Sequence, residues 1–179
     1  MKKVLIISTS LRNNSNSDIM AKSFGDGAVA AGNEVEYVTL RDKRIEFCKG
    51  CFACQRLGKC VIKDDSNAIV DKMAEADVIV WATPVYYYSM SGQMKTLIDR
   101  ANPLYVRDIK LKEVYLLATA TEDEEYTPEG TVKGVQGWID CFDGVNLGGV
   151  VFAGGVTDPG DIRNKEQLSV AYKMGADIK

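Results

Sequence analysis

The segment Val4–Ser17, VLIISTSLRNNSNS, changes abruptly from a short apolar run to hydroxyls, amides and one arginine. Its first four residues are bulky and mostly β-branched, which predicts a strand buried on both faces. A helical pattern follows, and Ser15, Asn16 and Ser17 are all suitable N-cap residues for it. A strand, a polar loop and a helix in this order indicate the first unit of an α/β fold.

The loop between this strand and helix has the chemistry of an anion site. Free backbone N–H groups and the helix dipole both point into such a loop. The side chains add the guanidinium of Arg12 and the hydroxyls of Ser8, Thr9, Ser10, Ser15 and Ser17. Hydroxyl donors and one cation suit a terminal phosphate. The absence of GxGxxG and GxxxxGK[ST] argues against a dinucleotide or a nucleoside triphosphate. A polar loop with good capping is the alternative.

Composition narrows the class of protein. The chain has 179 residues, which suits one domain over 1–179, and its net charge of −3 argues against a nucleic-acid or anionic membrane surface. The first apolar run ends at Ser8, too soon for a signal peptide, and no segment approaches the ~20 apolar residues of a membrane span. We therefore expect a cytoplasmic protein. The sequence contains no histidine, so catalysis by imidazole and histidine-ligated metal sites are excluded.

Strand and helix patterns alternate along the chain. Strands are predicted at 4–7, 35–40, 78–82, 114–119 and 145–153, and helices at 17–31, 67–74, 91–100, 131–142 and 165–174. Apolar central strands separated by helices indicate a parallel sheet covered on both faces. Five such strands fit the doubly wound order 2-1-3-4-5, in which a ligand lies at the carboxyl ends of the first and third strands.

The loop after the third strand must then face the phosphate loop. It reads TPVYYYSMSG over residues 83–92, and Pro84 makes the chain leave the strand rigidly. Tyr86, Tyr87 and Tyr88 place three large apolar faces near water unless something flat covers them. A planar heteroaromatic ligand would do so, and packing on the core or on a neighbouring subunit is the alternative.

Together, STSLRNNSNS and TPVYYYSMSGQMKTLIDR resemble the NAD(P)H-dependent FMN reductase family of flavodoxin-like proteins, and more narrowly its iron–sulfur flavoprotein branch. The resemblance implies a flavodoxin-like fold with bound FMN. It assigns the FMN phosphate to Ser10, Arg12, Ser15, Asn16 and Ser17. It places the isoalloxazine ring against Pro84, Val85, Tyr86 and Tyr87, and a third flavin-contacting segment at Ala120, Thr121 and Glu122. This third segment departs from the family, where glycine is common, and continues into a run of acids expected to be solvated.

Four of the five cysteines lie in a loop at about 47–62, in the spacing Cys48-x2-Cys51-x2-Cys54-x5-Cys60. Three thiols at x2 intervals are typical of an iron–sulfur cluster rather than of zinc. The resemblance implies that these four cysteines ligate a [4Fe-4S] cluster beside FMN, and we expect their loop near the mouth of the flavin site. Free thiols or a disulfide pair are the alternatives. Cys141, alone in a helical pattern, is expected in the core.

The resemblance implies an FMN-dependent oxidoreductase that takes electrons from NADH or NADPH and reduces a quinone, an azo compound, free flavin or a protein acceptor. No acid–base residue is assigned, because the flavin does the chemistry and the protein places it. The alternatives are an electron-transfer protein that relays electrons from a ferredoxin through [4Fe-4S] to FMN, and a cysteine-based redox sensor. The family also implies a homodimer or homotetramer. Lys95, Asp99 and Arg100 are expected to serve structure, the first two as a helical ion pair.

Overall fold

A parallel sheet with the strand order β2-β1-β3-β5-β6 forms the centre of the computed structural model, which describes residues 1–179. Its strands are β1 (Lys3–Ser8), β2 (Glu34–Thr39), β3 (Val78–Tyr86), β5 (Glu113–Thr119) and β6 (Asn146–Ala153). These five strands have the predicted doubly wound order, so the predicted fold class is confirmed. A sixth strand, β4 (Ser89–Met90), pairs antiparallel with the end of β3. It has too few residues to leave a pattern in the sequence.

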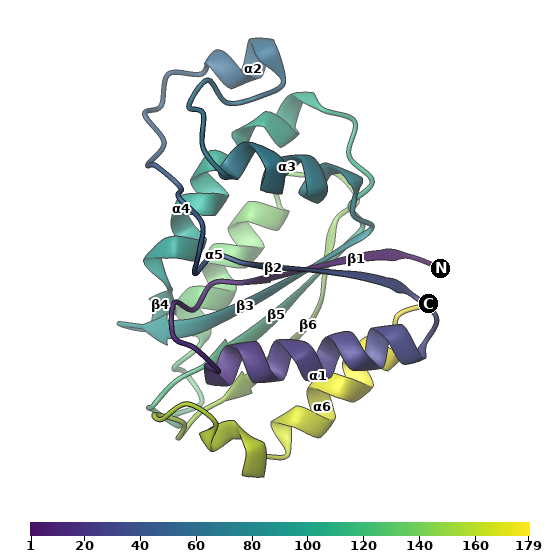
Figure 1. Ribbon diagram of the computed structural model, residues 1–179, viewed down its shortest axis with the longest axis vertical. Coiled ribbons are helices and arrows are strands. Elements are labelled where there is room, and N and C mark those ends of the chain that lie inside the picture. The colour runs from purple at the N-terminus through teal and green to yellow at the C-terminus, as the bar shows by residue number, and fades with distance from the viewer.

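Helices cover both faces of the sheet (Figure 1). One face carries α1 (Asn16–Ala30) and α6 (Gln167–Ala176), and the other carries α3 (Ser66–Glu75), α4 (Gly92–Arg100) and α5 (Glu129–Ile139). Three short elements complete the fold: α2 (Ala53–Leu57) and the 3-10 turns η1 (Asn102–Val106) and η2 (Asp161–Asn164). The five predicted helices all form, with each end within three residues of its expected place. The short elements were not predicted.

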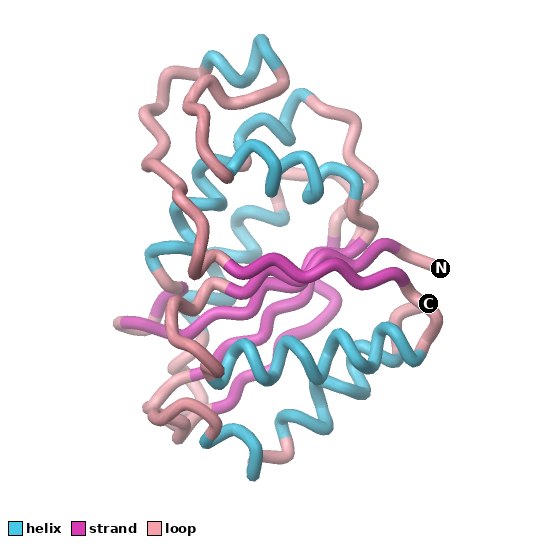
Figure 2. Tube along the Cα trace, viewed as in Figure 1, coloured by secondary structure: helices cyan, strands magenta, loops and turns pink.

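The central strands are buried on both faces, as their apolar sequences predict. Alternate residues point to opposite faces of a strand, so Leu5 and Ile7 join one core while Val4 and Ile6 join the other. The larger core lies between the sheet and α3, α4 and α5, and the smaller one between the sheet and α1 and α6. Figure 2 shows the strands as one layer between these helices, with long loops at the carboxyl ends of the strands.

Helices α1 and α6 approach each other closely at two glycines. A Cβ atom added at Gly175 would overlap the carbonyl oxygen of Phe24, and one added at Gly27 would overlap the carbonyl oxygen of Tyr172. We expect Gly175→Ala to lower the free energy of unfolding by about 1–3 kcal/mol, because the two helices would have to move apart. Urea denaturation followed by circular dichroism measures this change.

Gly137→Ala is the matched control for this prediction. Gly137 lies in α5, and a Cβ atom there meets nothing within 4 Å. Its replacement should raise the free energy of unfolding by about 0.5–1 kcal/mol through helix propensity alone. If both variants shifted stability in the same direction by the same amount, the close packing of α1 on α6 would be contradicted.

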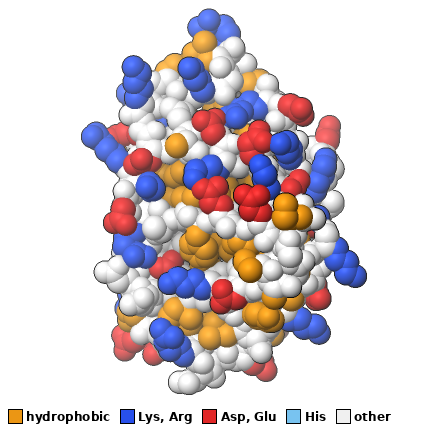
Figure 3. Space-filling model, turned by 45° about the vertical axis from the view of Figure 1, so that its right-hand side comes forward, with side chains coloured by type: hydrophobic (Ala, Val, Ile, Leu, Met, Phe, Trp, Pro, Cys, Tyr) orange, Lys and Arg blue, Asp and Glu red, His pale blue; other side chains and the backbone are white.

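The surface carries charges of both signs. Lys and Arg side chains alternate with Asp and Glu side chains over the face drawn in Figure 3, with no broad area of one sign. Lys95 and Asp99 form the exposed i,i+4 ion pair expected on α4. None of the helices has the length and apolar character needed to span a membrane.

Candidate functional site

Loops at the carboxyl ends of β1, β3, β5 and β6 surround one cavity of about 330 Å³, which is within the range of small-molecule sites. The predicted FMN-contact residues all line this cavity: Ser10, Arg12, Ser15, Asn16, Ser17, Pro84, Val85, Tyr86, Tyr87, Ala120, Thr121 and Glu122. Tyr88, the third tyrosine of the predicted loop, also lines it, and the sequence analysis missed four further lining residues: Thr119, Thr127, Val156 and Thr157. The structure therefore brings the predicted set together, while its contact with FMN stays a prediction.

One end of the cavity is built by the start of α1. The hydroxyl of Ser15 accepts a hydrogen bond from the N–H of Asp18 at 3.2 Å, so Ser15 is the N-cap. Asn16 and Ser17 are then the first helical residues, and their N–H groups have no acceptor within the helix. The hydroxyl of Ser17 lies 3.3 Å from that of Ser15. Hydroxyls and free N–H groups therefore gather at the positive end of the helix dipole.

The loop after β6 closes this end of the cavity. Arg12 donates to the carbonyl oxygen of Thr157 at 2.7 Å. The Asn16 amide donates to the carbonyl oxygen of Asp158 at 3.0 Å and accepts from the N–H groups of Gly160 and Ile162. The side chain of Asn16 thus makes three hydrogen bonds to this loop, which leaves one amide N–H and its backbone N–H available to an anion.

A second set of contacts fastens the first loop from behind. Asp18 is buried, accepts a hydrogen bond from the hydroxyl of Ser8, and forms an ion pair with Arg41 at 2.8 Å. Arg41 also donates to the side-chain oxygen of Asn13 at 2.8 Å. Arg41 therefore offsets the negative charge of Asp18, which lies in the first turn of α1 next to Ser17, and ties the loop after β2 to the loop after β1.

The tyrosines form a strained hairpin at the side of the cavity. Tyr86 pairs with Ser89, so Tyr87 and Tyr88 are the two residues of the turn between β3 and β4. Their φ angles are 49° and 61°, in the left-handed region that bulky residues rarely occupy. The ring of Tyr87 is fully exposed, and Tyr88 stacks on Tyr126 with ring centroids 5.8 Å apart. Strained aromatic residues beside a cavity are typical of a functional loop.

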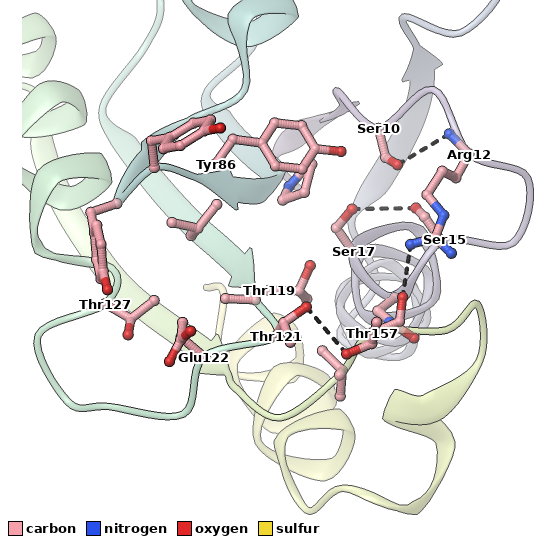
Figure 4. Close-up of a pocket in the computed structure, with 17 residues that line it drawn as sticks. Ser10, Arg12, Ser15, Ser17, Tyr86, Thr119, Thr121, Glu122, Thr127 and Thr157 are labelled. Atoms are coloured by element: carbon pink, nitrogen blue, oxygen red, sulfur yellow. Dashed lines mark hydrogen bonds between the residues drawn. The ribbon is translucent and has the colours of Figure 1, made fainter.

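The loop after β5 supplies the third wall. Ala120, Thr121 and Glu122 lie along it, and the hydroxyl of Thr121 accepts from that of Thr157 at 3.2 Å. The acidic run that begins at Glu122 is exposed, as expected for a solvated loop. Figure 4 shows Thr127 and Glu122 at the end of the cavity opposite Arg12 and Ser15. The cavity is therefore elongated, and the one cationic side chain that lines it, Arg12, lies at one end.

These residues fit FMN in their chemistry. A phosphate needs hydrogen-bond donors and a cation, and the loop after β1 supplies serine hydroxyls and the guanidinium of Arg12. A flat ring needs an apolar wall, which Pro84, Val85 and Tyr86 supply beside the hydroxyls of the opposite loop. The buried hydroxyl of Thr127 has no partner within the protein, as expected where a polar ligand is to be bound.

The cysteine-rich segment does not lie at the mouth of this cavity, so that expectation is wrong. None of its thiols lines the cavity. Helix α2, which carries Cys54, lies at the top of Figure 1, whereas the loops that surround the cavity lie at the lower left. It packs against η1, just beyond the C-terminal end of α4, while α4 begins beside the tyrosine hairpin.

A buried arginine explains the path of this segment. Arg100, the last residue of α4, donates to the carbonyl oxygens of Glu46 at 2.6 Å and Ile62 at 3.3 Å, where the segment leaves and returns. It also holds both carboxylate oxygens of Asp64, at 2.7 and 3.0 Å. One guanidinium thus binds both stems of the segment, meaning the chain at Glu46 where it begins and at Ile62 where it ends. The expectation that Arg100 serves structure is confirmed.

The four cysteines of the segment are unpaired. Cys48 and Cys51 are exposed, Cys60 is half-buried and Cys54 is buried. Burial raises the pKa of the Cys54 thiol, and the charges of the other three thiols raise it further. No three cysteine or carboxylate side chains converge on one ion. The cysteine side chains are therefore not arranged as a metal site in this structure.

Cys141 is exposed, so its expected place in the core is wrong. Helix α5 ends at Ile139, earlier than the predicted end at 142, so Cys141 lies beyond the last helical turn. Trp138 and Phe142 fill the core positions beside it, with ring centroids 5.4 Å apart. The Cys141 thiol donates to the carbonyl oxygen of Gly137 at 3.3 Å instead.

The fold and the position of the cavity define the class: this is a flavodoxin-like protein, with its cavity at the switch point between β1 and β3. Solved structures share the fold. A NAD(P)H:quinone oxidoreductase from Methanothermobacter marburgensis has a TM-score of 0.75 at 21% identity, covering 98% of this chain and 94% of that one. An azoreductase from Bacillus anthracis has a TM-score of 0.73 at 17% identity, covering 99% and 100%.

The chain belongs to the NADPH-dependent FMN reductase family, whose profile matches residues 2–126. An iron–sulfur flavoprotein of Methanosarcina thermophila is 30% identical over 156 residues, covering 87% of this chain and 82% of the relative. An iron–sulfur flavoprotein of Methanocaldococcus jannaschii is 39% identical over 104 residues, covering 58% of this chain and 54% of the relative. The chain therefore spans about half the length of this second relative. The resemblance stated from the two loop motifs is confirmed.

Proposed function

We propose that this protein is an FMN-dependent oxidoreductase that takes electrons from NADH or NADPH and passes them to a quinone, an azo compound, free flavin or a protein acceptor. One observation carries the proposal: a single elongated cavity has phosphate-binding chemistry at one end and an apolar wall with exposed tyrosines at the other. Membership of the FMN reductase family supports FMN as the cofactor and NAD(P)H as the donor. The names of the structural neighbours support quinones and azo compounds as acceptors.

The chain's own residues bind and orient in this proposal. When bound, FMN supplies the redox chemistry. Ser10, Ser15, Ser17 and the guanidinium of Arg12 hold its phosphate, together with the free N–H groups at the start of α1. Pro84 to Tyr86 support one face of the ring, and the exposed hairpin leaves the other face open to a flat donor or acceptor.

Anaerobic steady-state kinetics test this function. The FMN-loaded protein is expected to oxidise NADH or NADPH only when an acceptor such as a benzoquinone or an azo dye is present, and apoprotein is expected to oxidise neither. If the FMN-loaded protein oxidised neither nucleotide but accepted electrons from a reduced ferredoxin, the electron-transfer alternative would replace this proposal.

We infer a second function from the cysteine-rich segment: a [4Fe-4S] cluster held by Cys48, Cys51, Cys54 and Cys60, which would make the protein an electron-transfer iron–sulfur flavoprotein. Four reduced thiols on one loop, with both stems of that loop held by Arg100, support this assignment. So do the names of two relatives at 30% and 39% identity. The acceptor or donor protein would then approach the α2 side of the molecule.

Anaerobic purification with an iron assay tests the cluster. About four irons per chain, with a broad visible shoulder beside the flavin bands, are expected for the wild type. Cys54→Ser should lose the iron, whereas Cys141→Ser, which changes a cysteine outside the segment, should keep it. Flavin bands without iron in the wild type would contradict the cluster and leave the reductase proposal unaffected.

A further inference from the structure

Thr127 is a buried residue of the cavity wall with an unused hydroxyl. It lies in the loop between β5 and α5, is 1% exposed, and lines the cavity. Its Oγ1 atom has no hydrogen-bond partner in the protein. Buried hydroxyls are nearly always hydrogen-bonded, so an unpaired one on a residue that lines a cavity points to a partner supplied by a ligand, reached by a rotation of the threonine side chain.

Its position identifies which part of a ligand it would meet. Thr127 lies at the end of the cavity opposite Ser15 and Arg12 (Figure 4). FMN carries its phosphate at one end and its ring system at the other. If the phosphate binds at the start of α1, the ring reaches the end where Tyr86 and Thr127 lie. The ring's carbonyl oxygens are the acceptors available there.

The surroundings hold Thr127 in place. Its own N–H donates to the carbonyl oxygen of Glu124 at 3.0 Å, which closes a turn before α5. The next helical residues pack on the tyrosine hairpin, because a Cβ atom at Gly130 would overlap the carbonyl oxygen of Tyr88. Stacking of Tyr88 on Tyr126 joins the same two loops. Thr127 is therefore fixed relative to the wall that supports the ring.

We propose that the hydroxyl of Thr127 donates a hydrogen bond to a carbonyl oxygen at the polar edge of the isoalloxazine ring. This inference rests on the proposed FMN site and adds a residue that positions the ring rather than the phosphate. Reduction places negative charge on that edge of the ring. A donor there stabilises the reduced form more than the oxidised form and raises the midpoint potential.

Thr127→Val tests this role, because it removes the hydroxyl while keeping the shape. FMN affinity should fall about 3- to 10-fold, as expected for one neutral hydrogen bond, and the midpoint potential of bound FMN should become more negative. Thr127→Ser should restore both values. Thr131→Val is the matched control, since Thr131 is also fully buried with an unpaired hydroxyl but does not line the cavity. It should bind FMN like the wild type.

The outcomes separate this inference from the proposed function. If wild type fails to bind FMN, the FMN site itself is wrong. If wild type binds FMN and Thr127→Val matches it in affinity and potential, only the role of Thr127 is overturned. Loss of affinity in Thr127→Val and Thr131→Val alike would show a general effect on stability and would also overturn it. Thermal melting of each variant confirms that the protein compared is folded.

Discussion

Asp64→Asn is expected to lower the free energy of unfolding by about 3–5 kcal/mol. The side chains of Asp64 and Arg100 are only 2% and 0% exposed, and they share two close contacts. Removing the carboxylate charge leaves a buried guanidinium without its counter-ion, and this costs far more than the loss of one surface ion pair. It also loosens the stems of the cysteine-rich segment, which Arg100 holds together.

Asp71→Asn serves as the matched control for this effect. Asp71 pairs with Arg107 at 2.6 Å, but its side chain is 67% exposed, so its replacement should cost less than about 1 kcal/mol. Urea denaturation of the two variants against the wild type compares the two costs. If Asp64→Asn were no more destabilising than Asp71→Asn, the account of Arg100 as the structural anchor of the segment would be wrong.

The same pair predicts how stability changes with pH. Burial alone would raise the pKa of Asp64, but hydrogen bonds from Arg100 and from the backbone of Glu46 and Ser66 lower it from 3.8 to about 2. The folded state therefore favours the charged carboxylate by about 2 kcal/mol. This contribution is complete above pH 4 and is lost as pH falls towards 2. Asp64→Asn should flatten the acid limb of the stability curve, and an unchanged limb would contradict the lowered pKa.

Arg12→Met and Ser17→Ala are each expected to weaken FMN binding by about 10- to 150-fold. Hydrogen bonds to a charged group contribute about 1.5–3 kcal/mol each, and both side chains lie at the phosphate end of the cavity. Ser15 is less suitable for this test, because its hydroxyl also caps α1 and its loss would change helix stability. Fluorescence quenching on titration with FMN measures the affinity.

Ser23→Ala is the control on the same helix. The hydroxyl of Ser23 donates to the carbonyl oxygen of Leu168 at 2.8 Å, away from the cavity. Its replacement should leave FMN affinity unchanged. Riboflavin provides a second control, because it lacks the phosphate, and its affinity should not respond to Arg12→Met. A similar loss for FMN and riboflavin would show that Arg12 does not bind the phosphate.

Much of the fold could be predicted because each strand carries its own signal. Val4–Ile7 and Val78–Ala82 are continuous apolar runs of strand length, a pattern typical of strands covered on both faces. Five such strands separated by helices fit the doubly wound order, and the structure has that order. The two-residue strand β4 and the five-residue helix α2 could not be predicted, because elements so short show no periodicity.

The candidate site was predictable where its residues share one loop. Ser10 to Ser17 and Pro84 to Tyr87 are local motifs, so the sequence alone placed them together at the carboxyl ends of β1 and β3. Thr157 was missed although a signal existed, since it follows β6 at the same edge of the sheet. Thr127 was missed because only the packing of α5 on the hairpin brings it to the cavity.

The position of the cysteine-rich segment was not available from sequence. It depends on the contact between Asp64 and Arg100, which are 36 residues apart, and neither residue stands in a local motif. The four-residue spacing that made Lys95 and Asp99 a predictable pair has no counterpart for this long-range contact. Contacts of this kind are decided by tertiary packing.

Titration of the apoprotein with FMN and with riboflavin tests the central claim most directly. The two ligands differ only in the phosphate, which the loop after β1 is proposed to bind. We predict one FMN bound per chain, with an affinity about 100-fold or more above that of riboflavin. Equal affinities would contradict the assignment of the phosphate to this loop, and binding of neither ligand would contradict the flavin site as a whole.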